Sequence, residues 1–91
     1  MAETDLKKLE RPIKAFANKR RLAMVKYIKR RREASVGDIA EAIPLSIKAT
    51  SKHLGILVAA DVLEREQRNI QVFYTMARDL PGVAKMLITL L

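Results

Sequence analysis

The sequence predicts a mainly α-helical domain with one small β-hairpin, in the order α-α-α-α-β-β-α. Apolar residues recur at helical spacing along most of the chain. Residues 62–67 and 70–76 are instead rich in β-branched and aromatic residues, as strands are. The chain has 91 residues, of which 49% are apolar and only 4% aromatic. We therefore expect a single domain, 1–91, with an aliphatic core.

The first predicted helix covers residues 4–17. Its apolar positions follow a helical stripe: Leu6, Leu9, Ile13, Phe16 and Ala17. Pro12 interrupts this stripe, so either the helix kinks there or it starts near Arg11 with proline in its first turn. We favour one helix with a fault at Pro12.

The second predicted helix covers residues 19–31 and begins at Asn18, a good N-cap. Its inward-facing residues are Leu22, Val25 and Ile28. Residues 29–32 place a run of positive charges at its C-terminus, where they complement the helix dipole. This run has two interpretations. Arg30, Arg31 and Arg32 contact phosphate, or they form a solvated helix end.

Residues 35–57 contain two short helical patterns joined by a tight turn. The first starts at Ser35, with Asp38 completing a variant of the capping box, and Pro44 ends it. Its apolar stripe is Val36, Ile39, Ala40 and Ile43. Ser46 caps the second helix. The apolar stripe predicted for the second helix is Ile47, Thr50, Leu54 and Leu57.

The outer face of the second short helix is basic and small. It carries Lys48, Ser51, Lys52 and Gly55. Two short helices with such an outer face are typical of a helix-turn-helix, whose second helix enters the DNA major groove. The alternative is an ordinary helical hairpin with a solvated lysine face. The candidate DNA-binding residues of this helix are Ser46, Lys48, Ala49, Ser51, Lys52, His53 and Gly55.

The two predicted strands form a hairpin directly after the helix-turn-helix, in the position of the wing of a winged helix-turn-helix. Arg68 and Asn69 are predicted to form its tight turn, because asparagine tolerates positive φ. Arg65 on the ribbon, with Arg68 and Asn69 at the tip, would touch phosphate or the minor groove. Phe73 and Tyr74 are expected to pack rather than stack on bases.

The last predicted helix, residues 82–91, follows Pro81 and is apolar around most of its circumference. Lys85 is its only charged residue. A helix of this kind must be covered, and a second copy of the chain offers the same surface. The pattern therefore predicts a dimer.

Charge and composition limit the possible functions. The net charge of +8 favours a polyanionic partner, nucleic acid first and an anionic membrane surface second. The chain has no cysteine and a single histidine, so neither a disulfide framework nor a thiolate metal site is possible. With no P-loop or paired-carboxylate motif, we expect no enzyme and no cofactor. The absence of a long apolar run or signal peptide predicts a cytoplasmic, nucleoid-associated protein without membrane contact.

Four segments form a recognisable series: residues 16–22, the Ser-Lys-His-Leu run at 51–54 with Leu57, Val62-Leu63 and Phe73-Tyr74. In this order they resemble the ArsR-type winged-helix transcriptional regulators, over roughly residues 6–91. The resemblance implies a homodimer that pairs its first and last helices and represses transcription by binding an operator. The interface residues it implies are Leu6, Leu9, Ile13, Val83, Met86, Leu87 and Leu90.

The chain departs from that family at its metal sites. Metal-sensing members carry cysteines where this chain has Ser35 and Gly37. Their other sensor site, on the last helix, uses Asp and His pairs, whereas this region offers Asp79 and no histidine. His53 matches a structural histidine of the family and is expected to pack or contact phosphate rather than bind metal. We therefore expect no metal sensor.

The main prediction is a homodimeric, sequence-specific regulator that binds double-stranded DNA, acts as a repressor and does not respond to metals. Two alternatives use the same features. One is a non-specific architectural or nucleoid DNA-binding protein, for which few base-reading side chains suffice. The other is a winged-helix module that binds protein through its apolar last helix.

Overall fold

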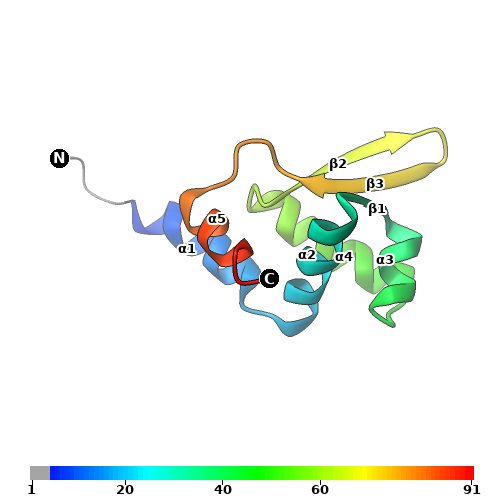
Figure 1. Ribbon diagram of the computed structural model, residues 1–91, viewed down its shortest axis with the longest axis horizontal. Helices are drawn as coiled ribbons and strands as arrows, with labels where there is room; N and C mark the ends of the chain where they lie inside the picture. The colour runs from blue at the N-terminus through cyan, green and yellow to red at the C-terminus, as the bar shows by residue number, and fades with distance from the viewer. Residues whose placement is uncertain (1–4) are drawn as a thin grey trace.

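The computed structural model describes residues 5–91. Residue 4, the first of the predicted 4–17 helix, lies outside the described residues. The described residues form five helices and a three-stranded antiparallel sheet (Figure 1). In chain order they are α1 (Leu6–Phe16), α2 (Lys19–Arg31), β1 (Glu33–Ser35), α3 (Val36–Ala42), α4 (Ile47–Ala59), β2 (Leu63–Arg68), β3 (Gln71–Met76) and α5 (Gly82–Ile88). The predicted winged helix-turn-helix is confirmed.

Side-chain caps start the helices where the sequence predicts. Asn18 Oδ1 accepts the backbone N–H of Arg20 and Arg21 at the start of α2. Ser35 Oγ accepts the N–H of Asp38, and Ser46 Oγ that of Ala49, each at 3.1 Å. Helix α1 begins at an unpredicted cap, Asp5, whose carboxylate accepts the backbone N–H of Lys7 and Lys8. It continues through Pro12 as one helix, with that proline buried inside it.

The sheet contains one strand that the sequence did not predict. Residues 33–35 form β1, and the strand order is β1-β3-β2. Three residues next to a run of arginines give too short a pattern to recognise. Its pairing, Ala34 opposite Tyr74 on β3, joins the helix-turn-helix to the hairpin.

The hairpin turn is one residue later than predicted. Arg68 pairs with Gln71, so Asn69 and Ile70 form the turn and the expected Arg68-Asn69 turn is wrong. Asn69 has the positive φ, 57°, that the sequence suggested. Arg68 therefore ends β2 instead of standing at the tip, and Ile70, 95% exposed, stands there.

One hydrophobic core joins all five helices to the sheet. Met24, Val25 and Ile28 of α2 are fully buried at its centre, and Leu54 and Leu57 of α4 pack there too. Tyr74 is buried and Phe73 half-buried, as predicted. Helix α5 contributes Ala84 and Ile88, and ends three residues before the predicted end at 91.

Two positions on the core-facing side of α4 differ from a simple apolar stripe. Ile47 is 53% exposed, so its predicted burial is wrong. It occupies the first turn, about 60° from the middle of the stripe formed by Thr50, Leu54 and Leu57. Thr50 is fully buried, and its hydroxyl has no hydrogen-bond partner within the described chain.

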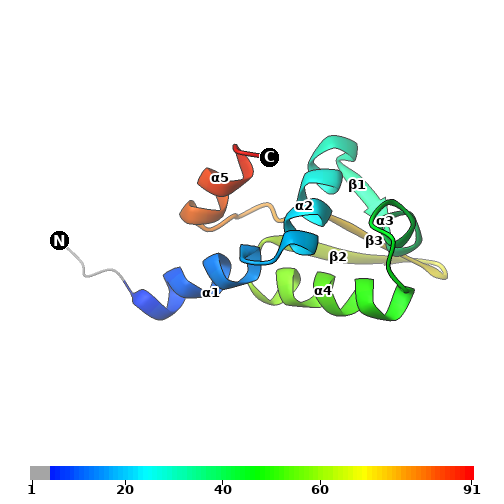
Figure 2. The same cartoon turned by 90° about the horizontal axis from the view of Figure 1, so that it is seen from below.

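The helices divide between two sides of the molecule. In Figure 2, α1 and α4 lie along one side, while α5 and the C-terminal end of α2 lie on the other. Helices α1 and α5 contact each other. These two helices and the turn that follows α5 expose several large apolar side chains: Leu6, Leu9, Ile13, Met86 and Leu90.

Candidate nucleic-acid interface

The outer face of α4 is small and basic. Lys48, Lys52 and Gly55 are exposed on it, opposite the buried Thr50 and Leu54. A Cβ added at Gly55 would meet no atom within 4 Å, so another surface can approach closely there. The other candidate residues of this helix are less open. Ser51, Ala49 and His53 are half-buried, and the hydroxyl of the exposed Ser46 is engaged in the cap.

Arg21 connects α4 to the end of α1. Its Nε donates to the carbonyl oxygen of Ala15 at 2.6 Å, and its Nη1 lies 3.1 Å from Nδ1 of His53. An arginine can only donate, so Nδ1 accepts and the ring is neutral. Burial lowers the pKa of His53, and the charges of Arg21, Arg20 and Lys52 lower it further. His53 is therefore a packing and positioning residue that holds Arg21 against α4.

The start of α2 adds cations beside this contact. Its first turn contains Lys19, Arg20 and Arg21 and no acidic residue. Cations at a helix N-terminus oppose the helix dipole and disfavour the helix, whereas a bound anion reverses that effect. In the sequence, Lys19, Arg20 and Arg21 stand out only as part of the family resemblance at residues 16–22. Their position directly after the Asn18 cap is the signal that marks them as a cationic helix N-terminus.

The two faces of the wing carry different charges. Side chains alternate along a strand, so Arg65 shares a face with the buried Leu63 and with its partner Tyr74, whereas Arg68 lies on the opposite face. Helix α4 contacts β2, and the buried face of the sheet faces the helices. Arg65 is thus the wing arginine on the side of α4.

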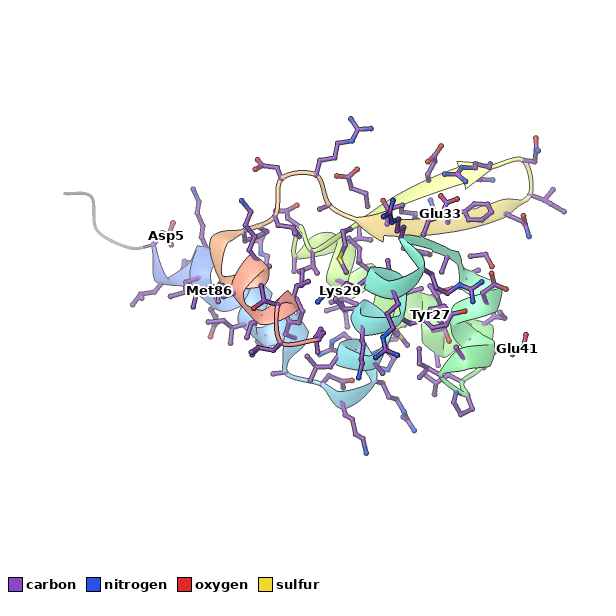
Figure 3. All side chains as sticks on the ribbon, in the orientation of Figure 1. Asp5, Tyr27, Lys29, Glu33, Glu41 and Met86 are labelled. Atoms are coloured by element: carbon purple, nitrogen blue, oxygen red, sulfur yellow. The ribbon has the colours of Figure 1, made fainter. Side chains whose placement is uncertain are left out.

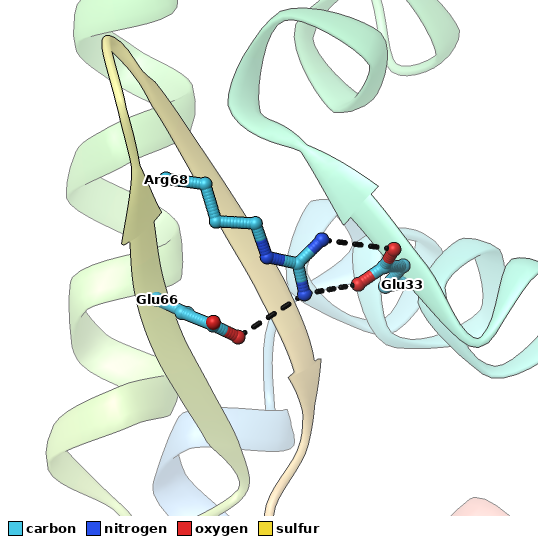
Figure 4. A network of polar contacts seen from close by, with 3 residues as sticks. All are labelled: Glu33, Glu66 and Arg68. Carbon is cyan, nitrogen blue, oxygen red and sulfur yellow. Dashed lines mark hydrogen bonds and ion pairs between the residues drawn. The ribbon is translucent and has the colours of Figure 1, made fainter.

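Arg68 is held by two carboxylates on the outer face of the sheet (Figure 4). Its Nη1 and Nη2 donate to Glu33 at 3.1 and 2.7 Å, and Nη2 also donates to Glu66 at 3.1 Å. The guanidinium lies 4.5 Å from the centre of the Phe73 ring. These hydrogen bonds lower the pKa of both carboxyl groups and raise the pKa of Arg68. Glu64 shares this face and accepts the N–H of Arg78, so the face is acidic and unsuited to phosphate.

Comparison with known proteins identifies the family. The family model described as "Helix-turn-helix domain" matches residues 16–66, more than half of the chain. The solved structure of HlyU from Vibrio cholerae is 30% identical, with a TM-score of 0.82 over 98% of this chain and 92% of that one. The chain belongs to the ArsR-type winged helix-turn-helix transcriptional regulators.

Two further solved structures resemble the regulator. A homodimeric winged helix-turn-helix DNA-binding domain from Mycobacterium bovis, described as a possible ArsR-family regulator, is 25% identical, with a TM-score of 0.80 over 99% of this chain and 85% of that one. The transcriptional repressor PagR of Bacillus anthracis is 22% identical, with a TM-score of 0.77 over 94% of this chain and 95% of that one, and shows the same fold. No curated protein sequence matches the regulator significantly.

The predicted basic run at residues 29–32 does not share a face with α4. The C-terminal end of α2 lies on the side of the regulator opposite α4 (Figure 2). Lys29, labelled in Figure 3, donates from Nζ to the carbonyl oxygen of Ile88 at 3.0 Å and so caps α5. Arg31 lies 5.2 Å from the centre of the Tyr27 ring, and Arg30 and Arg32 are exposed.

Ser35 and Gly37, where the resemblance implies cysteines in metal-sensing members, lie at the start of α3 in the regulator. Ser35 is buried and caps α3, while Gly37 is exposed in its first turn. Between residues 5 and 91, no group of three or more His, Asp or Glu side chains is arranged to hold a metal ion. No helix in this part of the chain is long and apolar enough to cross a membrane.

Proposed function

We propose that the regulator binds double-stranded DNA with α4 in the major groove. The observation that carries this proposal is the outer face of α4, where Lys48, Lys52 and the open Gly55 stand beside the cationic first turn of α2. The walls of the DNA major groove can approach such a face closely, and its side chains offer hydrogen-bond donors to base edges and phosphates. Lys48, Ser51 and Lys52 would lie nearest the bases. Ser46, Ala49, His53 and Gly55 would line the contact.

Backbone phosphates would be held from both ends of this face. Lys19 and Arg20 offer charge and the N-terminus of α2, and Arg65 approaches from the wing. Asn69 and the exposed Ile70 form the turn, and we propose that they reach the minor groove. Arg68 would first have to leave Glu33 and Glu66, so we assign it to bracing the wing. Arg30, Arg31 and Arg32 are assigned to the solvated end of α2 and not to the duplex that α4 contacts.

We further propose that the functional unit is a homodimer formed through α1 and α5. Leu6, Met86 and Leu90 are 73%, 70% and 80% exposed, which is costly for residues of this size on a monomer. Leu9 and Ile13 continue the apolar surface on α1, and the half-buried Val83 and Leu87 continue it on α5. A two-fold axis through this surface buries it against itself and presents two copies of α4 to an inverted repeat.

The regulator would act as a repressor by occupying its operator. It would do so without a metal ion, because the chain has no cysteine and Ser35 is committed to capping α3. Its cationic surfaces and lack of a catalytic constellation suit a non-enzymatic, cytoplasmic protein of the nucleoid. Residues 1–91 would form the single DNA-binding domain that carries all of these contacts.

Selection of bound sites from a random double-stranded DNA pool tests the proposal. We expect one enriched inverted repeat whose affinity is unchanged by added zinc, cadmium or arsenite. Binding without any enriched sequence would favour an architectural protein, and no binding at all would favour a protein-interaction module.

A further inference from the structure

A second feature lies on the α1 and α4 side of the molecule, at the C-terminal end of the outer face of α4. It is a groove of about 630 Å³ between α1 and the C-terminal half of α4. Its lining combines an apolar part with three cations. The apolar part is Ala15, Ile56, Ala59 and Ala60, and the cations are Arg11, Lys14 and Arg21.

These cations have no acidic partner. No carboxylate lines the groove, and in the part of the chain that the structure describes all ion pairs involve Arg68 instead. Arg21 uses Nε for Ala15 and Nη1 for His53, which leaves Nη2 to donate elsewhere. Three uncompensated charges around one concavity raise the local concentration of an anion.

The apolar part of the lining favours anions that carry an apolar body over simple inorganic anions. Ile56 is 40% exposed at the groove, and the three alanines extend its apolar surface. A simple inorganic anion would leave that surface in water, whereas a hydrocarbon or aryl body would cover it. We propose that the groove binds an amphipathic organic anion, with its carboxylate or sulfonate among the cations and its apolar body against Ile56.

The groove stays open in the proposed dimer. At about 100° per residue, Arg11 and Lys14 lie on a different side of α1 from Leu9 and Ile13. The apolar side of α1 lines a separate hollow, which confirms that the two surfaces are distinct. An occupant of the groove would touch both α1 and α4 and meet Arg21, which joins them.

Titration of the full chain with decanoate, below its micelle concentration and without DNA, tests the site. Backbone amide NMR shifts should saturate at one decanoate per chain and centre on Arg21, Ile56 and Ala60. Decyltrimethylammonium, which has a tail one carbon longer and the opposite charge, should leave these signals in place. Inorganic phosphate at the same concentration should also leave them in place, and equal shifts with phosphate would overturn the proposal in favour of a plain anion site.

Two substitutions make the test specific to this groove. Lys14→Gln should weaken decanoate binding roughly three- to fivefold, as loss of one exposed ion pair does, while Lys26→Gln, an equal charge loss on exposed α2 surface, should not. Ile56→Glu should abolish binding, with the fold checked by circular dichroism. Shifts centred on Leu9 and Met86, or binding that survives Ile56→Glu, would refute the site. Because DNA is absent, none of these results depends on the proposed function.

Discussion

Arg68 and Glu33 form a two-point contact between the wing and β1. Two parallel N–H donors of the guanidinium meet both carboxylate oxygens of Glu33, at 3.1 and 2.7 Å. This geometry fixes orientation as well as distance. Because Glu33 immediately precedes the helix-turn-helix, the contact sets the wing relative to the helices. It also removes the charge of Arg68 from the surface available to phosphate.

The two wing arginines should therefore behave differently when replaced by alanine. Arg65→Ala should weaken binding to all DNA sequences and lower the slope of log affinity against log salt by about one. Arg68→Ala should leave that slope unchanged. The measurement is DNA affinity over a salt series, with exposed Arg78→Ala as the matched control. If Arg68→Ala alone reduces the slope, Arg68 abandons its carboxylates to bind phosphate.

The outer face of α4 can be tested by charge and by shape. Lys52→Ala should cost about 1–3 kcal/mol of binding free energy on the preferred site and relax preference at one base pair. Gly55→Leu should block binding but keep the melting temperature, because a side chain there projects into open space. Lys26→Ala, on exposed α2 surface, controls for net charge. Unchanged specific binding in both variants would exclude α4 from the groove.

The dimer is tested at the exposed surface of α5. Met86, labelled in Figure 3, is 70% exposed, so Met86→Glu should not disturb the core of a monomer. In a dimer it would bury an unpaired charge, and sedimentation at micromolar concentration should then show single chains. Ile70→Glu, at the wing tip, should remain dimeric. A wild-type protein that sediments as a monomer would contradict the proposed interface.

The free energy of unfolding should decrease as the pH is lowered through the range in which His53 becomes protonated. Its pKa is lowered from 6.5, chiefly by burial, so the folded state favours the neutral ring. The stability from this preference is complete above pH 6.5 and is lost as the pH falls below that value. Glu33 and Glu66, whose pKa values are lowered from 4.5, lose their contributions only at lower pH. Melting temperatures between pH 7.5 and 5 should therefore decline, and His53→Gln should flatten the decline.

Thr50→Val should stabilise the protein. The Thr50 hydroxyl is buried without a hydrogen-bond partner in the described chain, and valine has nearly the same shape. Removing an unsatisfied buried hydroxyl should raise the free energy of unfolding by about 1 kcal/mol, measured by urea denaturation. Ser51→Ala, beside it on the half-buried edge of α4, should change stability less. A destabilised Thr50→Val would show that the hydroxyl has a partner.

Much of the fold could be predicted from the sequence, because the helix starts are determined by residues close together in the chain. Asn18, Ser35 and Ser46 each cap the helix that follows, as helix-start chemistry predicts. Strand β1 was missed because its three residues are defined by pairing with β3, which is distant in sequence. The one-residue error at the turn has a similar origin. The register that puts Asn69 and Ile70 in the turn is fixed by pairing along both strands.

The candidate site was predicted less completely than the fold. The exposed positions of α4 follow from helical periodicity, and Lys48, Lys52 and Gly55 lie where expected. The ion pair of Arg68 with Glu33 does not follow from helical periodicity, because Glu33 is 35 residues away along the chain. The same holds for Lys29, which meets Ile88 only in the folded molecule. A count of basic residues gives the sign of the net charge. Which cations remain available to bind phosphate depends on the face of the strand that each occupies and on its contacts with residues distant in sequence.

Arg21 bears on the architecture of any operator. Through Ala15 and His53 it couples α1, which carries the proposed two-fold contact, to α4, which carries the base-reading face. In the proposed dimer, the separation between the two copies of α4 would therefore be set partly by this guanidinium and partly by the packing of Ala15 and Phe16 in the core that α4 shares. Replacing Arg21 would alter the number of base pairs that separate two matching half-sites, while each half-site kept its own sequence.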